Sequence, residues 1–304
     1  MISTVSEHLL FSFYNLKVRP SDVWIVTFPR SGTTVTQEMV WLLANDLDFE
    51  TASNIRITRR SPFLEACCSL HPEFCAELLK ENEDSQENCR VIKMLSESIC
   101  TIIDAMQDRR IIKTHLPLSL LPKNLLTAGC KVVYVARNPK DVAVSFYHFH
   151  RLNRLLDFRN DFPTFWKYFT KNLVQWSPYW DHVFEAWDKR KEENLLFLFY
   201  ENIDKDLKGV ISKVQNFLGT KFTQEQLSQL ENHLKIENFR LNKSVTLDHL
   251  YQLKLFRDDE RKFIRESNSK KETKSCYFDD QLESEADEWI SERLRNSDLK
   301  FPPI

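Results

Sequence analysis

Residues 23–34 read VWIVTFPRSGTT and decide the fold of this chain. The run Val23–Phe28 is apolar and rich in β-branched and aromatic side chains, so it predicts a buried strand. A turn containing Gly32, one of only four glycines, follows this run. After the turn, apolar residues recur with the period of a helix and share one face: Val35, Met39, Leu42 and Leu43. A strand, a tight turn and a helix in this order are typical of α/β proteins.

Three further apolar runs predict strands that join the first: Arg110–Thr114, Lys131–Ala136 and Leu195–Tyr200. Amphipathic helical patterns lie between and after them, one from Lys140 onwards and others over residues 207–218 and 282–290. This alternation predicts an α/β fold, with a central parallel sheet flanked by helices, in a single domain over residues 1–304. The polar stretches Glu81–Asn88 and Ser267–Ser275 are predicted to be surface loops.

Composition excludes several classes of protein. The 304 residues include 42 basic and 44 acidic side chains, a formal net charge of −2, whereas dedicated nucleic-acid binders are usually strongly basic. No apolar run approaches the ~18 residues of a membrane helix, and the amino terminus lacks the basic start of a signal peptide. Seven cysteines without a C-x-x-C pair predict reduced thiols and no zinc site. We therefore expect a cytoplasmic protein without a nucleic-acid or membrane partner.

The turn after the first strand is a candidate anion site. A helix that opens directly after a strand leaves backbone N–H groups pointing at one spot, and the helix dipole favours negative charge there. Arg30 adds a cation, Gly32 permits close approach of a phosphate, and hydroxyls come from Ser31, Thr33 and Thr34. A plain capped helix is an equally good interpretation of this segment alone. Nucleotide triphosphatase loops need a Gly-Lys ending, whereas Thr33 follows Gly32 here. A magnesium-dependent kinase is therefore a distant third hypothesis, behind the two functions considered below.

Two later strand ends carry polar groups of the same kind. Arg137 ends one predicted strand and Ser145 lies early in the next helix, so both can face the crevice where open α/β sheets bind ligands. A surface salt bridge and an ordinary helix serine are the alternatives. Lys113 and His115 share one face of another strand, where lysine can neutralise developing charge and imidazole can remove a hydroxyl proton. An isolated Lys-x-His is usually incidental.

Taken together, these segments resemble the cytosolic sulfotransferase family. The resemblance is carried in order by PRSGTT (29–34), PFLE (62–65), KTHLPLSLLP (113–122), KVVYVARNPKDVAVSFYHFH (131–150) and FYE (199–201). Such proteins have one α/β domain and transfer a sulfonyl group from 3′-phosphoadenosine 5′-phosphosulfate (PAPS) to a small lipophilic alcohol or phenol. The resemblance implies 3′-phosphoadenosine 5′-phosphate (PAP) as the product, no metal, and an arthropod-like member with a divergent carboxyl-terminal phosphate loop.

The resemblance also implies roles for particular residues. His115 matches the catalytic base, Lys113 a lysine beside the transferred group, and Arg30 a cation of the 5′-phosphosulfate loop. Phe63 and Phe149, with Lys113 and His115, match positions that line the acceptor pocket. The residues expected to bind the cofactor are Arg30, Ser31, Gly32, Thr33, Thr34, Val35, Arg137, Ser145, Tyr200 and Arg265.

The chain departs from the family pattern in four places. Arg30 replaces a lysine, so we expect it to act by its charge and not as a proton donor. Val35 and Ile236 stand where aromatic residues usually contact adenine. The loop 265–271 has Glu266 in place of a cation and no glycine, and the dimerisation motif keeps only Lys274 and Glu283, so dimerisation stays open. These departures motivate one alternative, a non-catalytic small-molecule binder of the same fold. A sulfonation-dependent dehydratase is a second.

Overall fold

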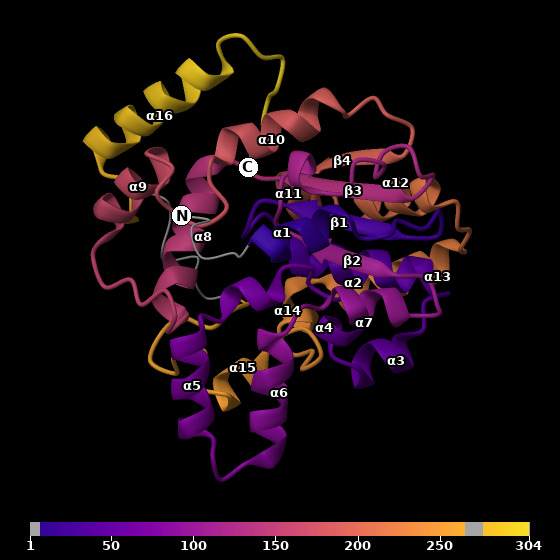
Figure 1. Cartoon of the computed structure of the whole chain (residues 1–304). Coiled ribbons are helices and arrows are strands. Elements are labelled where there is room, and N and C mark those ends of the chain that lie inside the picture. Colours follow the sequence, from indigo (N-terminus) through magenta and orange to yellow (C-terminus); the bar gives the residue numbers. More distant parts are fainter. Residues whose placement is uncertain (1–6, 265–275, 304) are drawn as a thin grey trace.

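The computed structural model describes residues 7–264 and 276–303, without the side chains of His8 and Ser69. Four parallel strands form one sheet in the order β2-β1-β3-β4, at the centre of the molecule in Figure 1. Their bounds are β1 Val23–Thr27, β2 Ile111–Thr114, β3 Lys131–Ala136 and β4 Leu195–Phe199. All four were predicted from the sequence, and so was the α/β class. The sheet follows from the runs of β-branched and aromatic residues, which are buried on both faces as parallel sheets require.

Each strand except β3 is one residue shorter than predicted: β1 and β4 end one residue earlier, and β2 begins one residue later. Arg110 precedes β2, and its buried side chain forms an ion pair with Asp22. Tyr200 does not end β4; it begins helix α11. Phe28 leaves β1 and packs edge-on against the rings of Phe146 and Tyr179.

Alternate residues of β1 face two different cores. Trp24 and Val26 pack with α1, α8, α9, α10 and α16, whereas Val23 and Ile25 pack with α2, α12 and α13. The helices of these two layers are α1 Glu7–Tyr14, α2 Thr33–Ala44, α8 Pro139–Leu152, α9 Phe162–Thr170, α10 Tyr179–Asp188, α11 Tyr200–Lys205, α12 Leu207–Leu218, α13 Gln224–Leu234 and α16 Asp280–Leu294. The helices predicted at 140, 207–218 and 282–290 are therefore present as α8, α12 and α16.

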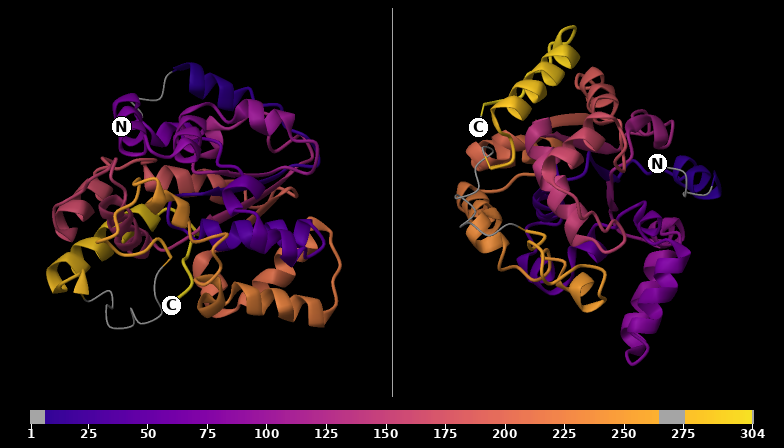
Figure 2. Two further views of the ribbon diagram at one scale, coloured as in Figure 1. Left: turned by 90° about the horizontal axis from the view of Figure 1, so that it is seen from below. Right: turned by 90° about the vertical axis from the view of Figure 1, so that its left-hand side faces the viewer.

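A helical hairpin of α5 (Pro72–Glu81) and α6 (Gln86–Ser96) projects away from the sheet, as Figures 1 and 2 show. It packs on a third, smaller core that includes Leu78, Ile92 and Phe256. The remaining short elements are α3 Phe49–Asn54, α4 Ile57–Arg60, η1 Ala66–Ser69, α7 Cys100–Ala105, η2 Leu118–Leu120, α14 Ile236–Phe239 and α15 Asp248–Gln252.

The loop predicted over Glu81–Asn88 is too long at both ends. Only residues 82–85 form the turn of the hairpin, because Ser85 caps α6: its hydroxyl accepts from the Asn88 N–H at 3.3 Å. The second predicted loop, Ser267–Ser275, lies outside the described residues. Within the described part of the chain, every helix is too short or too polar to cross a bilayer.

Candidate active site

The turn between β1 and α2 is shaped by two residues with left-handed backbone, Arg30 (φ 67°) and Gly32 (φ 94°). A Cβ at Gly32 would overlap the ring of Tyr200, so only glycine fits there. No side chain caps α2, and its first N–H groups therefore face the turn without a capping partner. The Ser31 hydroxyl is fully buried and has no hydrogen-bond partner among the described residues. An uncapped helix start beside an orphaned buried hydroxyl suits an anion such as a phosphosulfate.

Thr33 and Thr34 begin α2 on the cavity side of this turn. The Thr33 hydroxyl lies 2.7 Å from the hydroxyl of Thr27, which ends β1. Thr34 and Val35 line the same cavity as Arg30 and Gly32. Of the predicted residues of the turn, the structure places Arg30, Gly32, Thr33, Thr34 and Val35 at the cavity wall, whereas Ser31 is buried beneath it.

Arg30 extends from the turn toward α8. Its Nε donates to the Ser145 hydroxyl at 3.0 Å, and its Nη2 donates to the Phe263 carbonyl at 3.0 Å. The guanidinium also lies 4.6 Å from the ring centroid of Phe263 and 5.6 Å from that of Phe149. Arg30 therefore joins the anion turn to Ser145 and to the aromatic wall of the cavity.

Arg137, at the end of β3, lies beside the turn. Its Nη1 donates to the Arg30 carbonyl at 3.0 Å, and its guanidinium lies 4.2 Å from the ring centroid of Tyr200. Its Nε is buried and has no hydrogen-bond partner among the described residues. Arg137 and Tyr200 thus form one basic corner of the cavity with Arg30, which also binds Ser145 of α8. Arg265, predicted for this corner as well, lies outside the described residues.

His115 follows β2 and is buried. Its Nδ1 lies 2.9 Å from the Thr27 carbonyl oxygen. Since a carbonyl only accepts, Nδ1 carries the hydrogen and Nε2 keeps its lone pair. Burial, followed by the nearby charge of Lys113, holds the pKa of His115 well below its usual value. The imidazole is therefore neutral at pH 7 and can accept a proton at Nε2.

Lys113 lies on the same side of the strand end as His115, as its i, i+2 spacing predicts. Its Nζ sits 4.0 Å from the ring centroid of Phe63. Burial lowers the pKa of Lys113 to about 8, an effect that Arg30 reinforces and Glu65 opposes. Lys113 is therefore mostly cationic at neutral pH.

Two residues that the sequence analysis missed hold His115 in place. Glu65 is buried and accepts hydrogen bonds from the Thr114 hydroxyl (2.8 Å) and from the His115 backbone N–H. Burial raises the pKa of Glu65 to about 7. His182, on α10, donates from Nε2 to the His115 carbonyl at 3.0 Å. Glu65 lies in the quoted PFLE motif, which signalled it, whereas nothing local to His182 marked that residue.

One cavity of about 950 Å³ is lined by Arg30, Lys113, His115, Arg137, Ser145 and Tyr200, whereas Glu65 and His182 lie behind its wall. The rings of Phe63 and Trp176 lie edge-on to His115, and Phe149 lines the same cavity. Further apolar walls come from α6, α7 and the segment 247–264: Val91, Met94, Leu95, Ile102, Leu247, Leu250, Leu255, Phe256 and Ile264. The arrangement can hold a lipophilic molecule against a neutral imidazole, beside an anion site.

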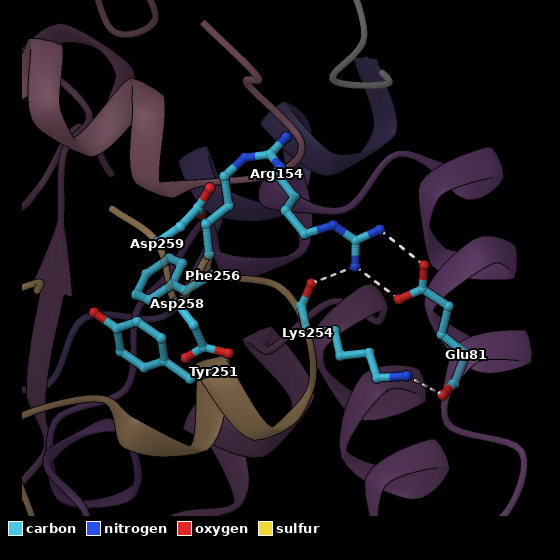
Figure 3. Close-up of a pocket in the computed structure, with 8 residues that line it drawn as sticks. Glu81, Arg154, Tyr251, Lys254, Phe256, Asp258 and Asp259 are labelled. Atoms are coloured by element: carbon cyan, nitrogen blue, oxygen red, sulfur yellow. Dashed lines mark hydrogen bonds and ion pairs between the residues drawn. The ribbon is translucent and has the colours of Figure 1, made fainter. Parts of the chain in front are cut away.

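A second pocket, of about 460 Å³, lies on the outer surface and is shown in Figure 3. Arg154, just after α8, binds both carboxylate oxygens of Glu81 at 2.7 and 2.8 Å and also donates to the Lys254 carbonyl. The Lys254 ammonium in turn donates to the Glu81 carbonyl at 2.9 Å. These charged groups pair with one another and join α5 to the segment 251–259. We call this set of contacts of Arg154, Glu81 and Lys254 the Arg154 clamp.

Comparisons with known proteins agree with this geometry. A family model described as a sulfotransferase domain matches residues 20–298. The luciferin sulfotransferase of Photinus pyralis is 32% identical over 95% of this chain and 75% of its own length. Sulfotransferase 4A1 of Homo sapiens is 35% identical over 72% of this chain and 67% of its own length. A crystal structure of retinol dehydratase in complex with retinol and PAP superposes with a TM-score of 0.89 at 38% identity, covering 97% of this chain and 88% of that one.

Proposed function

This chain belongs to the sulfotransferase family and is a PAPS-dependent sulfotransferase; we propose that its acceptor is the hydroxyl of a small lipophilic alcohol or phenol and that His115 is the general base. The main support for the proposal is Nε2 of the buried, neutral His115, which has no hydrogen-bond partner among the described residues and lies at a largely apolar cavity that also opens onto the anion turn. A cytoplasmic location and the absence of a nucleic-acid partner remain predictions from the sequence.

The residues of the turn and the basic corner suit PAPS. Ser31, Gly32, Thr33 and Thr34 would hold its 5′-phosphosulfate, and Arg137 with Ser145 would hold its 3′-phosphate. When bound, PAPS supplies the sulfonyl group that the acceptor oxygen receives. Tyr200 provides a ring near the turn, whereas Val35 and Ile236 offer no aromatic face to the adenine.

The chain's own residues account for the proton and for the charge. Nε2 of His115 takes the proton of the acceptor hydroxyl, because the Thr27 carbonyl fixes the hydrogen on Nδ1. Lys113 and Arg30 place positive charge where negative charge grows as the acceptor oxygen attacks. Burial among apolar walls excludes water, which would compete as the acceptor.

Transfer from labelled PAPS to a panel of phenols, sterols and retinoids tests the proposal. We expect transfer to at least one lipophilic alcohol, and a loss of roughly 10²–10⁴ in kcat for His115→Ala with PAP affinity unchanged. Calorimetry with PAP separates the outcomes. Acceptor binding without PAP binding would support the non-catalytic binder, and activity that survives His115→Ala would refute the assignment of the base.

A second candidate function is dehydration by way of a sulfonated alcohol. It is favoured by the 38% identity to a protein whose structure is described as retinol dehydratase. Mass spectrometry of the products decides between the two, because a sulfate ester retains the oxygen of the alcohol and an alkene does not.

A further inference from the structure

The rim of the cavity carries arginines whose charge has no partner. Arg56 precedes the short helix α4 and Arg59 lies within it; both are exposed and line the cavity. Neither side chain has a hydrogen bond or ion pair with any described residue. Their neighbour Arg60 behaves differently: its side chain is buried and paired with Glu38 at 2.6 Å. Of these three arginines, the two that face the cavity are therefore the two that are unpaired.

The cavity lining as a whole is basic. It carries seven arginine or lysine side chains and three carboxylates, those of Glu97, Asp204 and Glu237. Three of the seven cations, Arg30, Lys113 and Arg137, lie at the strand ends beside the anion turn. The other four are exposed at the rim: Arg56, Arg59, Arg90 and Lys235. The positive charge of the cavity is therefore divided between two groups of side chains. PAPS would pair with the group at the strand ends but not with the group at the rim.

The same cavity also has exposed apolar side chains in its lining. His115 is 7% exposed, whereas Met94, Ile102 and Ile236, which line the same cavity, are 44–46% exposed. Exposed apolar groups of this size usually mark a binding surface. His249 on α15 also lines the cavity, and burial and the nearby charges of Arg56 and Arg59 lower its pKa to about 4. Arg56 and Arg59 therefore lie near enough to the neutral His249 to lower its pKa, and all three side chains line the cavity.

Building on the proposed function, we propose that Arg56 and Arg59 bind a carboxylate at the far end of the acceptor. The preferred acceptors are then long-chain alcohols that end in an anion, with the hydroxyl at His115 and the chain along the apolar walls. Guanidinium groups suit this role because they bind carboxylates through two parallel hydrogen bonds.

Equilibrium dialysis in the presence of PAP tests the proposal without requiring turnover. The probes are ω-hydroxy fatty acids, from hydroxyoctanoic to hydroxyhexadecanoic acid, each compared with its methyl ester. We expect one acid to bind roughly tenfold more tightly than its ester, with a preference that falls at high salt. In Arg56→Gln/Arg59→Gln this ratio should approach one, and Arg56→Lys/Arg59→Lys should restore part of it.

The matched control is Lys213→Gln/Lys221→Gln, which removes the same charge from exposed positions outside the cavity. Its acid-to-ester ratio should equal that of the native protein. Thermal melting confirms that each variant folds.

Three results would overturn the proposal: no preference for the acid, a preference that survives in Arg56→Gln/Arg59→Gln, or binding of neither probe. A loss of PAP affinity equal to the loss of acid preference would also overturn it, because the arginines would then serve the nucleotide. A preference for the acid without sulfonyl transfer would uphold this inference and refute the proposed function instead.

Discussion

The floor and the cover of the cavity differ in what holds them. The floor consists of the turn 28–33 and residues 113–115, which are the ends of paired strands. The cover consists of the α5–α6 hairpin and the segment 247–263, which rest on a small apolar core and on the Arg154 clamp. Parallel pairing fixes the floor through the register Ile25–Lys113 and Val26–Thr114. The cover has only an isolated bridge, Asn153–Phe256, and no ladder of this kind.

The floor and the cover therefore serve different functions. Groups that bind the anion and move a proton need fixed geometry, and strand ends supply it. Groups that choose the acceptor can vary, and helices on the surface tolerate variation. Changes in the floor should therefore abolish activity, whereas changes in the cover should alter acceptor affinity.

Gly32→Ala should have the largest effect. The new Cβ overlaps the Tyr200 ring, and the backbone at φ 94° disfavours any side chain, so the turn must open. We expect PAP affinity to fall at least a hundredfold and stability to fall by about 1–3 kcal/mol. Calorimetry with PAP and urea unfolding measure the two effects.

Gly219→Ala is its matched control. This glycine also has positive φ (74°), but it has nothing within 4 Å of an added Cβ and lies outside the cavity. It should cost about 1 kcal/mol of backbone strain and leave PAP affinity intact. If both variants bind PAP equally, the turn does not depend on the fit of Gly32 against Tyr200.

Glu65→Gln should have an intermediate effect, since it loosens His115 without removing it. One amide oxygen cannot replace both carboxylate acceptors, so we expect kcat to fall about tenfold with little change in the acceptor KM. An effect on KM alone would contradict the positioning role of Glu65.

The same variant has a signature in its dependence on pH. The pKa of Glu65 is raised to about 7 in the folded protein from 4.5, so the folded state binds a proton that the unfolded state has released. Stability supplied by this group is therefore lost as pH rises from about 4.5 to about 7. The difference in unfolding free energy between native protein and Glu65→Gln should change over that window and be flat outside it.

Arg154→Ala should have the smallest effect, and this effect should be confined to the cover. Without the clamp, α5 loses its attachment to the segment 251–259, which bounds the acceptor side of the cavity. We expect the acceptor KM to rise severalfold, kcat and PAP affinity to stay constant, and hydrogen exchange to increase in α5. Stability should fall by no more than about 1 kcal/mol, because the pairs are near the surface.

Arg159→Ala tests whether the position of the lost charge matters. Arg159 pairs with Asp157 at 2.6 Å and more weakly with Glu260 at 3.9 Å, but it makes no ion pair with α5 among the described residues. It should leave the acceptor KM unchanged. An equal rise in KM for both variants would show that the cover responds to charge and not to the clamp.

The floor could be predicted largely from local sequence. The strands and the helices α2, α8 and α12 have strong periodic patterns. The residues of the turn, Lys113, His115 and Arg137 lie at or just after strand ends, and Ser145 lies in the helix that follows β3. The cover could not. Residues 86–88 were assigned to a loop because they are polar, although a serine cap and the apolar face of α6 make them helical. Glu65 and His182 were missed as positioning residues because their partners lie 50 and 67 residues away.

The sequence by itself determined the α/β class, the family and the chemical groups that meet at the strand ends, because strand pairing and helix periodicity are encoded within short segments. Only the tertiary structure decided which nitrogen of His115 is available and which of the neighbouring arginines 56, 59 and 60 faces the cavity. Those properties depend on hydrogen bonds and burial between segments far apart in the chain, which no local pattern records.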